Sequence, residues 1–278
     1  MCIRDRFRNC SSLKELNVSS FDTSKVKQMS NMFDGCSSLT TLDLSNFDTS
    51  NVTAMASMFE KCTSLKNLNL SSFNTSKVIY MDFMFSNCNS IENLNLSSFN
   101  TSKVTNMGNM FTNCYLLKKL DLSSFDTSNV TSMRSTFQNC NSLISLDLSN
   151  FNTSKVTLME EMFRSCHSLL NLNLSGFDTS SVTSTWYMFR DCDKLTELDL
   201  SSFNTSKVTN MNSMFGNCTT LKTIYVSELW DVSNVPSSDS IFYNCQLLAG
   251  AVSYDRTKTD KTMANYTTGY LTYKKNTN

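Results

Sequence analysis

The 278-residue sequence predicts an α/β solenoid of about ten 26-residue turns, with short parallel strands on one face and short helices on the other. Three observations lead to this class. Cysteine recurs every 26 positions from Cys10 to Cys218, and once more at Cys245 after 27 positions. A Leu-x-Leu alternation and a run of regularly spaced apolar residues return at the same interval. Because similar segments at a fixed period stack as successive turns, residues 7–248 are assigned to one array.

Residues 39–64 represent one turn. Within them, Leu42-Asp43-Leu44 alternates apolar and polar side chains, which predicts a short, half-buried strand. Consecutive turns of a solenoid run in the same direction, so their strands should pair in parallel about 4.8 Å apart. The predicted strands begin near Leu42, Leu68, Leu94, Leu120, Leu146, Leu172 and Leu198.

The second half of the turn predicts a short helix. Its apolar residues are spaced by three or four positions, which is typical of one helical face. They are Val52, Met55, Met58, Phe59 and Cys62. Thr49 or Ser50 stands just before them, where an N-cap is expected.

Phenylalanine and methionine fill recurring positions and are predicted to form the core. Eighteen of the nineteen Phe residues belong to two ladders, which run from Phe7 to Phe242 and from Phe21 to Phe203, with Phe83 as the exception. Fourteen of the sixteen Met residues occupy two positions of the predicted helix. Inward spacing in every turn favours a packed core over a binding stripe, and each buried ring should contribute about 1.5–3 kcal/mol.

The cysteine ladder has two interpretations, which are disulfides between adjacent turns and free buried thiols. Stacked strands keep parallel Cβ atoms about 4.8 Å apart, whereas a disulfide needs converging Cβ atoms about 3.5–4.5 Å apart. We therefore expect Cys36 to Cys218 to be buried and mostly unpaired. No local cluster of Cys or His suggests a metal site, and the single His167 is expected in a solvated loop.

A row of polar residues at the outward position of the strands is the candidate partner-contact face. Its members are Asn17, Asp43, Asn69, Asn95, Asp121, Asp147, Asn173, Asp199 and Tyr225. The row can be a solvated surface or a contact surface, and no cluster of exposed Trp, Tyr and Arg selects a ligand there.

The two ends of the chain depart from the repeat. Residues 1–6, Met-Cys-Ile-Arg-Asp-Arg, precede the register that starts at Phe7 and resemble a translated sequencing-library adapter. We interpret them as an assembly artefact on a fragment, so the absence of a signal peptide says nothing about compartment.

Residues 249–278 are predicted to form a C-terminal cap and tail, because a solenoid must cover its last apolar turn. The residues expected to fold back over that turn are Leu247, Leu248, Tyr254, Tyr270 and Leu271. Lys258 to Lys261 should be solvated, and residues 274–278 should be disordered or lead into a further segment.

The repeat resembles a known family. The Leu-x-x-Leu-x-Leu opening resembles a leucine-rich repeat. The fuller string Leu-Ser-x-Phe-Asp-Thr-Ser-x-Val-x-x-Met-x-x-Met-Phe-x-x-Cys is similar to the 26-residue repeat of BspA-like bacterial surface proteins. This resemblance implies a secreted or cell-surface protein with adhesion to proteins as its role, and it supplies no catalytic residue and no cofactor.

The resulting hypothesis is a monomeric, non-enzymatic repeat protein that binds an extracellular protein or other macromolecule. The alternative is a structural spacer that projects another domain from the cell surface. A formal charge of zero, from 24 basic and 24 acidic residues, gives no case for nucleic acid, and no apolar run is long enough to span a membrane. An enzyme is disfavoured by the lack of a catalytic constellation outside the repeat. An ice-binding surface, suggested by the ladder from Thr23 to Thr205, fits poorly because it is a single row.

Overall fold

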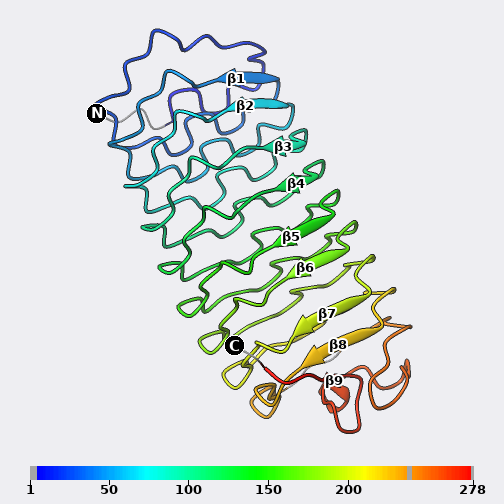
Figure 1. The fold of residues 1–278 in the computed structure, drawn as a ribbon. Helices are drawn as coiled ribbons and strands as arrows, with labels where there is room; N and C mark the ends of the chain where they lie inside the picture. Colours follow the sequence, from blue (N-terminus) through cyan, green and yellow to red (C-terminus); the bar gives the residue numbers. More distant parts are fainter. Residues whose placement is uncertain (1–4, 237–239, 277–278) are drawn as a thin grey trace.

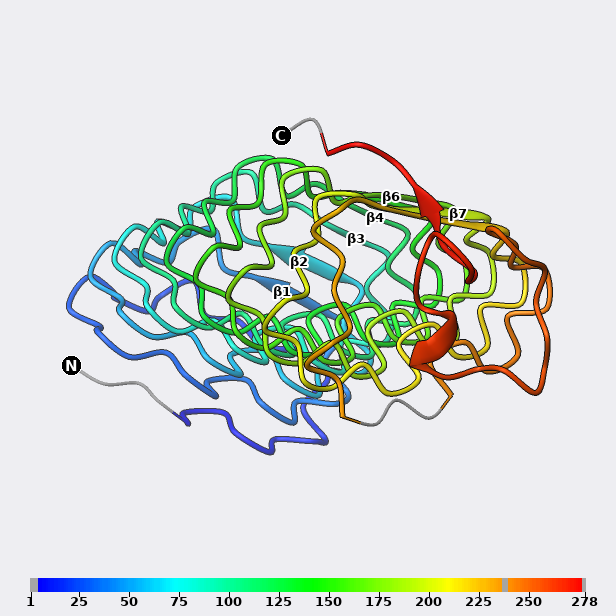
Figure 2. The ribbon, with the colours of Figure 1, turned by 90° about the horizontal axis from the view of Figure 1, so that it is seen from below.

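The structure, a computed structural model, describes residues 5–236 and 240–276 and is an elongated solenoid (Figures 1 and 2). Figure 1 shows the turns stacked along one axis, with the short strands aligned one after another. The alternation seen in the sequence explains each strand, since Leu42 is buried while Thr41 and Asp43 are exposed. The solenoid prediction is confirmed.

Nine strands lie within the described residues. They are β1 (Thr41–Asp43), β2 (Asn67–Asn69), β3 (Asn93–Leu94), β4 (Lys119–Leu120), β5 (Ser145–Asp147), β6 (Asn171–Asn173), β7 (Glu197–Leu200), β8 (Thr223–Val226) and β9 (Thr272–Tyr273). They form three two-stranded sheets, β1-β2, β3-β4 and β5-β6, and one three-stranded sheet, β7-β8-β9.

Pairing between turns is parallel and keeps the 26-residue offset, as in Leu42 with Leu68 and Leu146 with Leu172. A second line of contact consists of seven isolated parallel bridges that run in 26-residue steps from Gln28 to Asn210. These bridges define about seven regular turns. The expected count of ten turns is not confirmed.

The predicted helices and their N-caps are wrong within the described residues, where the only helical segment is a 3₁₀ turn, η1 (Lys261–Met263). Between Val52 and Cys62 the chain instead makes tight turns. The Cys62 N–H donates to the Phe59 carbonyl at 3.1 Å, but the Phe59 N–H donates to Met84 of the next turn at 3.0 Å. An α-helix is about 10 Å wide, roughly twice the spacing of stacked strands. Turns packed this closely leave no room for one helix each, so backbone groups bond to the neighbouring turn.

Left-handed backbone at two positions of each turn also prevents a helix. Ser57 has φ 55° and Lys61 has φ 59°, and most equivalent residues in the other turns share this conformation. Asn, Ser and Asp occupy many of these positions, in keeping with the tolerance of Asn and Asp for this region.

The apolar positions expected to face inward do so, although no helix carries them. Val52, Met55, Met58, Phe59 and Cys62 are all fully buried. The rings of Phe59 and Phe85 are stacked with centroids 5.6 Å apart. Phe83, outside both ladders, is 37% exposed. The predicted inward positions are therefore confirmed, and only the backbone conformation differs from the prediction.

The cysteine ladder is buried and unpaired from Cys36 to Cys218, as predicted. Each buried thiol also has a polar partner in the preceding turn. The Cys88 Sγ–H donates to the Phe59 carbonyl at 3.1 Å, and Cys114 repeats this contact with Phe85 at 3.2 Å. The thiols therefore act as small core residues that also tie adjacent turns together.

The threonine ladder is buried and links adjacent turns. The Thr101 hydroxyl donates to the Asp126 carbonyl at 2.8 Å and accepts the N–H of the same residue at 2.8 Å. Thr75 makes the equivalent pair of bonds with Asn100. Because these side chains are at most 3% exposed, they offer no surface to ice.

The C-terminal residues lie against the last turns of the solenoid. Leu248, Tyr270 and Leu271 are buried, and β9 pairs in parallel with β8. The Trp230 indole N–H donates to the Ala264 carbonyl at 3.1 Å, which links the shifted turn to this segment.

Three expectations for the C-terminal segment need correction. Leu247 is 53% exposed, because it points away from the last turn while Leu248 points into it. Lys261 is half-buried and donates to the Val235 carbonyl, although Lys258 is exposed as expected. Lys274 is held in place by side-chain contacts described below, whereas residues 277–278 lie outside the described residues.

Candidate functional site

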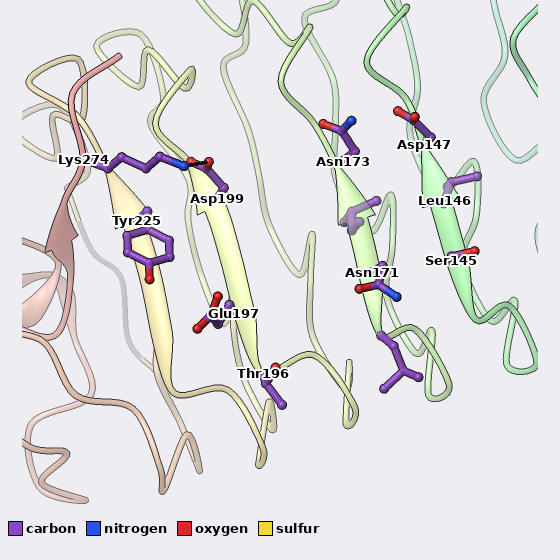
Figure 3. A pocket seen from close by; sticks show the side chains of 12 residues that line it. Ser145, Leu146, Asp147, Asn171, Asn173, Thr196, Glu197, Asp199, Tyr225 and Lys274 are labelled. Carbon is purple, nitrogen blue, oxygen red and sulfur yellow. Dashed lines mark hydrogen bonds and ion pairs between the residues drawn. The ribbon is translucent and has the colours of Figure 1, made fainter. Parts of the chain in front are cut away.

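The strand-face row, defined by the nine residues from Asn17 to Tyr225 named above, lies on the outer side of the strands. Eight members are exposed and Tyr225 is half-buried. Figure 3 shows Asp147, Asn173 and Asp199 at corresponding ends of successive strands. The 26-residue register places them there, because residues at the same repeat position lie side by side.

Each Asp or Asn of the row also forms a turn with the residues that follow it. Its side-chain oxygen accepts the N–H of the serine two residues later, at 2.9–3.1 Å in all eight cases. This Asx turn redirects the chain out of the strand. The restriction of the row to Asp and Asn thus has a local structural cause, which the sequence analysis missed.

The turn bonds also favour the ionised form of the aspartates. The backbone N–H of Ser45 donates to Asp43 and lowers its carboxyl pKa, and Ser123 and Ser149 do the same for Asp121 and Asp147. The face therefore presents carboxylates and amides at neutral pH, groups that can accept hydrogen bonds from a partner.

Lys274 closes the C-terminal end of the row (Figure 3). Its ammonium group lies 2.5 Å from Asp199 Oδ2 and 5.5 Å from the centre of the Tyr225 ring. Burial raises the pKa of Asp199, but the bonds from Lys274 and Ser201 outweigh it, so the pKa is lowered. The last exposed carboxylate of the row is therefore already paired.

Two shallow grooves follow the strand face. One, of about 1130 Å³, runs over β1–β4 and includes Asp43, Asn69 and Asn95. The other, of about 560 Å³, runs over β5–β8 and includes Asp147 and Asn173. Both are lined by strand residues of several turns, so any ligand seated there would contact several repeats together.

Groups with catalytic potential are few in the part of the chain that the structure describes. His167 is exposed, and its Nδ1 lies 2.7 Å from Asp193 Oδ2 in the next turn. No group of three His, Cys, Asp or Glu residues that could hold a metal ion occurs among the described residues. Residues 5–236 and 240–276 likewise contain no helix with the length and hydrophobicity needed to cross a membrane.

One group of residues that sequence reasoning missed lies away from the strands. Trp186 and Tyr187 stack on each other, and Arg164 and Arg190 approach the Tyr187 ring. The available signal was that the two arginines are 26 residues apart and so occupy the same position in adjacent turns.

Similar solved structures are leucine-rich repeat proteins of bacteria. A leucine rich cell surface protein from Faecalibacterium prausnitzii A2-165 has a TM-score of 0.48 at 18% identity, over 91% of this chain and 68% of that one. A leucine-rich repeat protein from Bacteroides ovatus has a TM-score of 0.37 at 18% identity, over 97% and 80%. An LRR protein of Leptospira interrogans has a TM-score of 0.32 at 15% identity, over 73% and 53%.

No curated protein matches the sequence. The expected resemblance to BspA-like leucine-rich repeat surface proteins is confirmed by a family match. The family described as "Mycoplasma protein of unknown function, DUF285" matches residues 2–119, 91–198, 143–254 and 170–278. Because these overlapping matches extend from residue 2 to residue 278, the chain belongs to the DUF285 family.

Proposed function

We propose that the chain is a non-enzymatic repeat protein of the bacterial cell surface that binds another protein along its strand face. The observation that carries this proposal is the strand-face row. It is a repeated polar position that stays exposed from turn to turn, whereas the threonine and cysteine ladders are buried inside the array. Surface location, a monomeric state and an extracellular protein partner are parts of the same proposal.

The chemistry of the row supports binding. A carboxylate has about four lone-pair positions, and the turn bond to serine uses one of them. The remaining acceptor capacity of Asp43, Asp121 and Asp147 faces the solvent, where a partner with Lys, Arg or backbone N–H groups could use it. Regular spacing along the solenoid would let one elongated partner contact several turns.

Variants that change charge while keeping the Asx turns test the proposal. One variant combines Asp121→Asn with Asp147→Asn, and the reverse variant combines Asn69→Asp with Asn95→Asp. Both residue types already accept the serine N–H in this row, so the Asx turns should survive. The full chain is tested by biolayer interferometry against a panel of purified extracellular proteins.

We expect saturable binding to at least one panel member, with the two variants shifting affinity in opposite directions by about threefold or more. An affinity that is unchanged in both variants would exclude the strand face as the contact surface. Absence of saturable binding to every panel member would remove the binding function.

A structural spacer is the second candidate, and one observation favours it. The Asp or Asn at each position is already explained by the turn that it forms, as with Asn95 and Ser97 at 3.1 Å. If the row serves folding alone, the chain should be stable and should bind no protein of the panel. The same experiment therefore separates the two functions.

A further inference from the structure

The side of the solenoid away from the strands carries an aromatic and cationic cluster. The rings of Trp186 and Tyr187 are stacked with centroids 4.4 Å apart. The guanidinium carbons of Arg164 and Arg190 lie 5.1 Å and 4.8 Å from the centre of the Tyr187 ring. We call these four residues the Trp186 cluster. Contacts of this length are within the range of cation–π attraction, so the arginines and the tyrosine hold one another in place.

Acidic neighbours fix the arginines and balance their charge. Arg164 Nη1 lies 2.6 Å from Glu161 Oε2, and the same oxygen accepts a bond from Gln138 at 2.7 Å. Arg190 Nε lies 3.4 Å from Asp191 Oδ2. Each guanidinium has five N–H donors, so these contacts leave donor capacity for a partner. The cluster is therefore ordered before any partner arrives, which lowers the entropy cost of binding.

The cluster interrupts the repeat. At the position of Tyr187 five other repeats carry small polar residues, namely Asn31, Ser57, Asn109, Ser135 and Ser213, whereas two carry Phe83 and Glu161. Tyr187 adopts φ 58°, a left-handed conformation that is costly for a bulky side chain and easier for Asn. No other repeat carries two adjacent aromatic residues at the positions of Trp186 and Tyr187, so the cluster distinguishes this turn from the rest of the array.

A neighbouring carboxylate supports the same conclusion. Glu160 holds the Trp186 position in the preceding turn, and its Oε2 is buried without a hydrogen-bond partner in the part of the chain that the structure describes. Glu161 ties the two turns together, since its N–H donates to the Trp186 carbonyl at 2.9 Å. A polar atom of this kind is costly unless something else bonds to it.

We infer that the Trp186 cluster is a localised contact site for a protein partner, separate from the strand-face row. Trp, Tyr and Arg are the residues that dominate binding energy at protein interfaces. The partner should place an apolar side chain against Trp186 and bring a carboxylate or carbonyl oxygen to the guanidinium groups. Nucleic acid fits less well, because Glu160, Glu161 and Asp191 offset the net positive charge that a phosphate backbone would need. This inference rests on the proposed binding function and gives it a specific site.

The test uses substitutions that the repeat itself contains. The double variant Trp186→Ala with Tyr187→Asn introduces Ala, found at position 56, and Asn, found at positions 31 and 109. Phe83→Asn is the matched control, because Phe83 holds the same repeat position as Tyr187, has φ 58° and is also an aromatic residue. Circular dichroism and thermal midpoints check that all the chains fold.

The probe is a phage-displayed library of random dodecapeptides selected on the full, unmodified chain. Synthetic copies of the selected peptides are then titrated by calorimetry. We expect peptides that combine acidic and apolar residues, with affinity reduced about tenfold or more by the double variant and changed less than about twofold by Phe83→Asn.

Each other outcome overturns the site. If peptides bind the double variant and the unmodified chain with equal affinity, the contact lies elsewhere. If Phe83→Asn reduces their affinity as much as the double variant does, the loss reflects the removal of any aromatic residue and not of this site. A library that yields no binding peptide also contradicts the site. The proposed binding function is judged independently by the strand-face variants and the protein panel.

Discussion

The middle and the C-terminal end of the solenoid cover the same core in different ways. In the middle, Phe111 is stacked between Phe85 and Phe137, with ring centroids 5.7 Å away on both sides. At the C-terminal end, Phe242 has such a neighbour on one side only. Tyr270 closes the other side, edge-on, with centroids 5.4 Å apart and an angle of 88°. A middle turn is thus covered by a copy of itself, and the last turn by a different segment.

The difference shows what ends a stack of apolar turns. The Tyr270 hydroxyl accepts the Asp255 N–H at 2.8 Å and donates to the Lys258 carbonyl at 3.0 Å. Its ring therefore covers Phe242 while its polar atom is satisfied by the C-terminal segment. One more repeat with phenylalanine at this position would cover Phe242 but expose its own apolar ring at the end of the stack. The predictions below test this contrast between middle and end.

The largest expected effect is alkaline unfolding of the middle turns. Burial raises the pKa of the Cys114 and Cys166 thiols to about 12. The folded state holds these protons more tightly than the unfolded chain, whose thiols titrate near pH 8.5. Their stabilisation is therefore complete below about pH 8.5 and is lost as the pH rises toward 12, by about 1.4 kcal/mol per thiol and pH unit.

Denaturant unfolding measured from pH 7 to pH 11 checks this, with nine buried cysteines in the described residues contributing together. A Cys114→Ala chain is the control, and its stability should fall less steeply with pH. Stability that stays constant up to pH 11 would contradict the burial argument.

Deleting residues 249–278 should destabilise the C-terminal end and promote association. The deletion uncovers Phe242 and Trp230, which are buried, and each should lose about 1.5–3 kcal/mol of apolar burial. Exposed ends of two chains can then cover each other, so sedimentation should show dimers and solubility should fall. If the shortened chain stays monomeric with unchanged melting behaviour, the segment is a linker and not a cap.

Phe111→Ala in the middle should lower the free energy of unfolding by about 3–5 kcal/mol. Phe7→Ala should cost less, because Phe7 is half-buried and stacks on Phe33 in the adjacent turn without being enclosed. Urea unfolding of both variants measures the difference. Equal losses would show that turns do not depend on neighbours on both sides.

Thr101→Val should cost about 1–3 kcal/mol, although the side chains have nearly the same shape. The substitution leaves both the N–H and the carbonyl of Asp126 without the partner that Thr101 provides. Thermal unfolding measures the loss, and Thr101→Ser serves as the control because it keeps the hydroxyl. If the Val variant is as stable as the unmodified chain, the hydrogen bonds of the threonine ladder do not stabilise the fold.

The smallest effect is expected for Lys274→Ala, at about 1 kcal/mol or less, since exposed ion pairs contribute little. The Asp199 pKa, which the Lys274 contact lowers, should rise in this variant. Titration of the Asp199 carboxyl followed by NMR would show it. A carboxyl that titrates unchanged would mean that Lys274 does not hold the end of the row.

Much of the fold could be predicted because the same spacing of apolar and polar residues recurs in successive turns. The inward positions of Phe59, Cys62 and Leu42, the parallel strands and the free thiols all followed from spacing. The helices could not be excluded in this way, since tight turns with left-handed residues place apolar side chains inward at much the same spacing as a helix. Leu247 and Leu248 were likewise indistinguishable in sequence, although only Leu248 is buried.

The sequence by itself determined the period, the set of core residues and the direction in which the turns stack, because each depends on spacing along one chain. Contacts between adjacent turns were decided by the tertiary structure. The bonds from Thr101 to the next turn and the approach of Arg164 to Tyr187 exist only when turns lie in register. The close stacking of turns also decided the backbone conformation, since a layer about 4.8 Å thick is too thin for a helix about 10 Å wide.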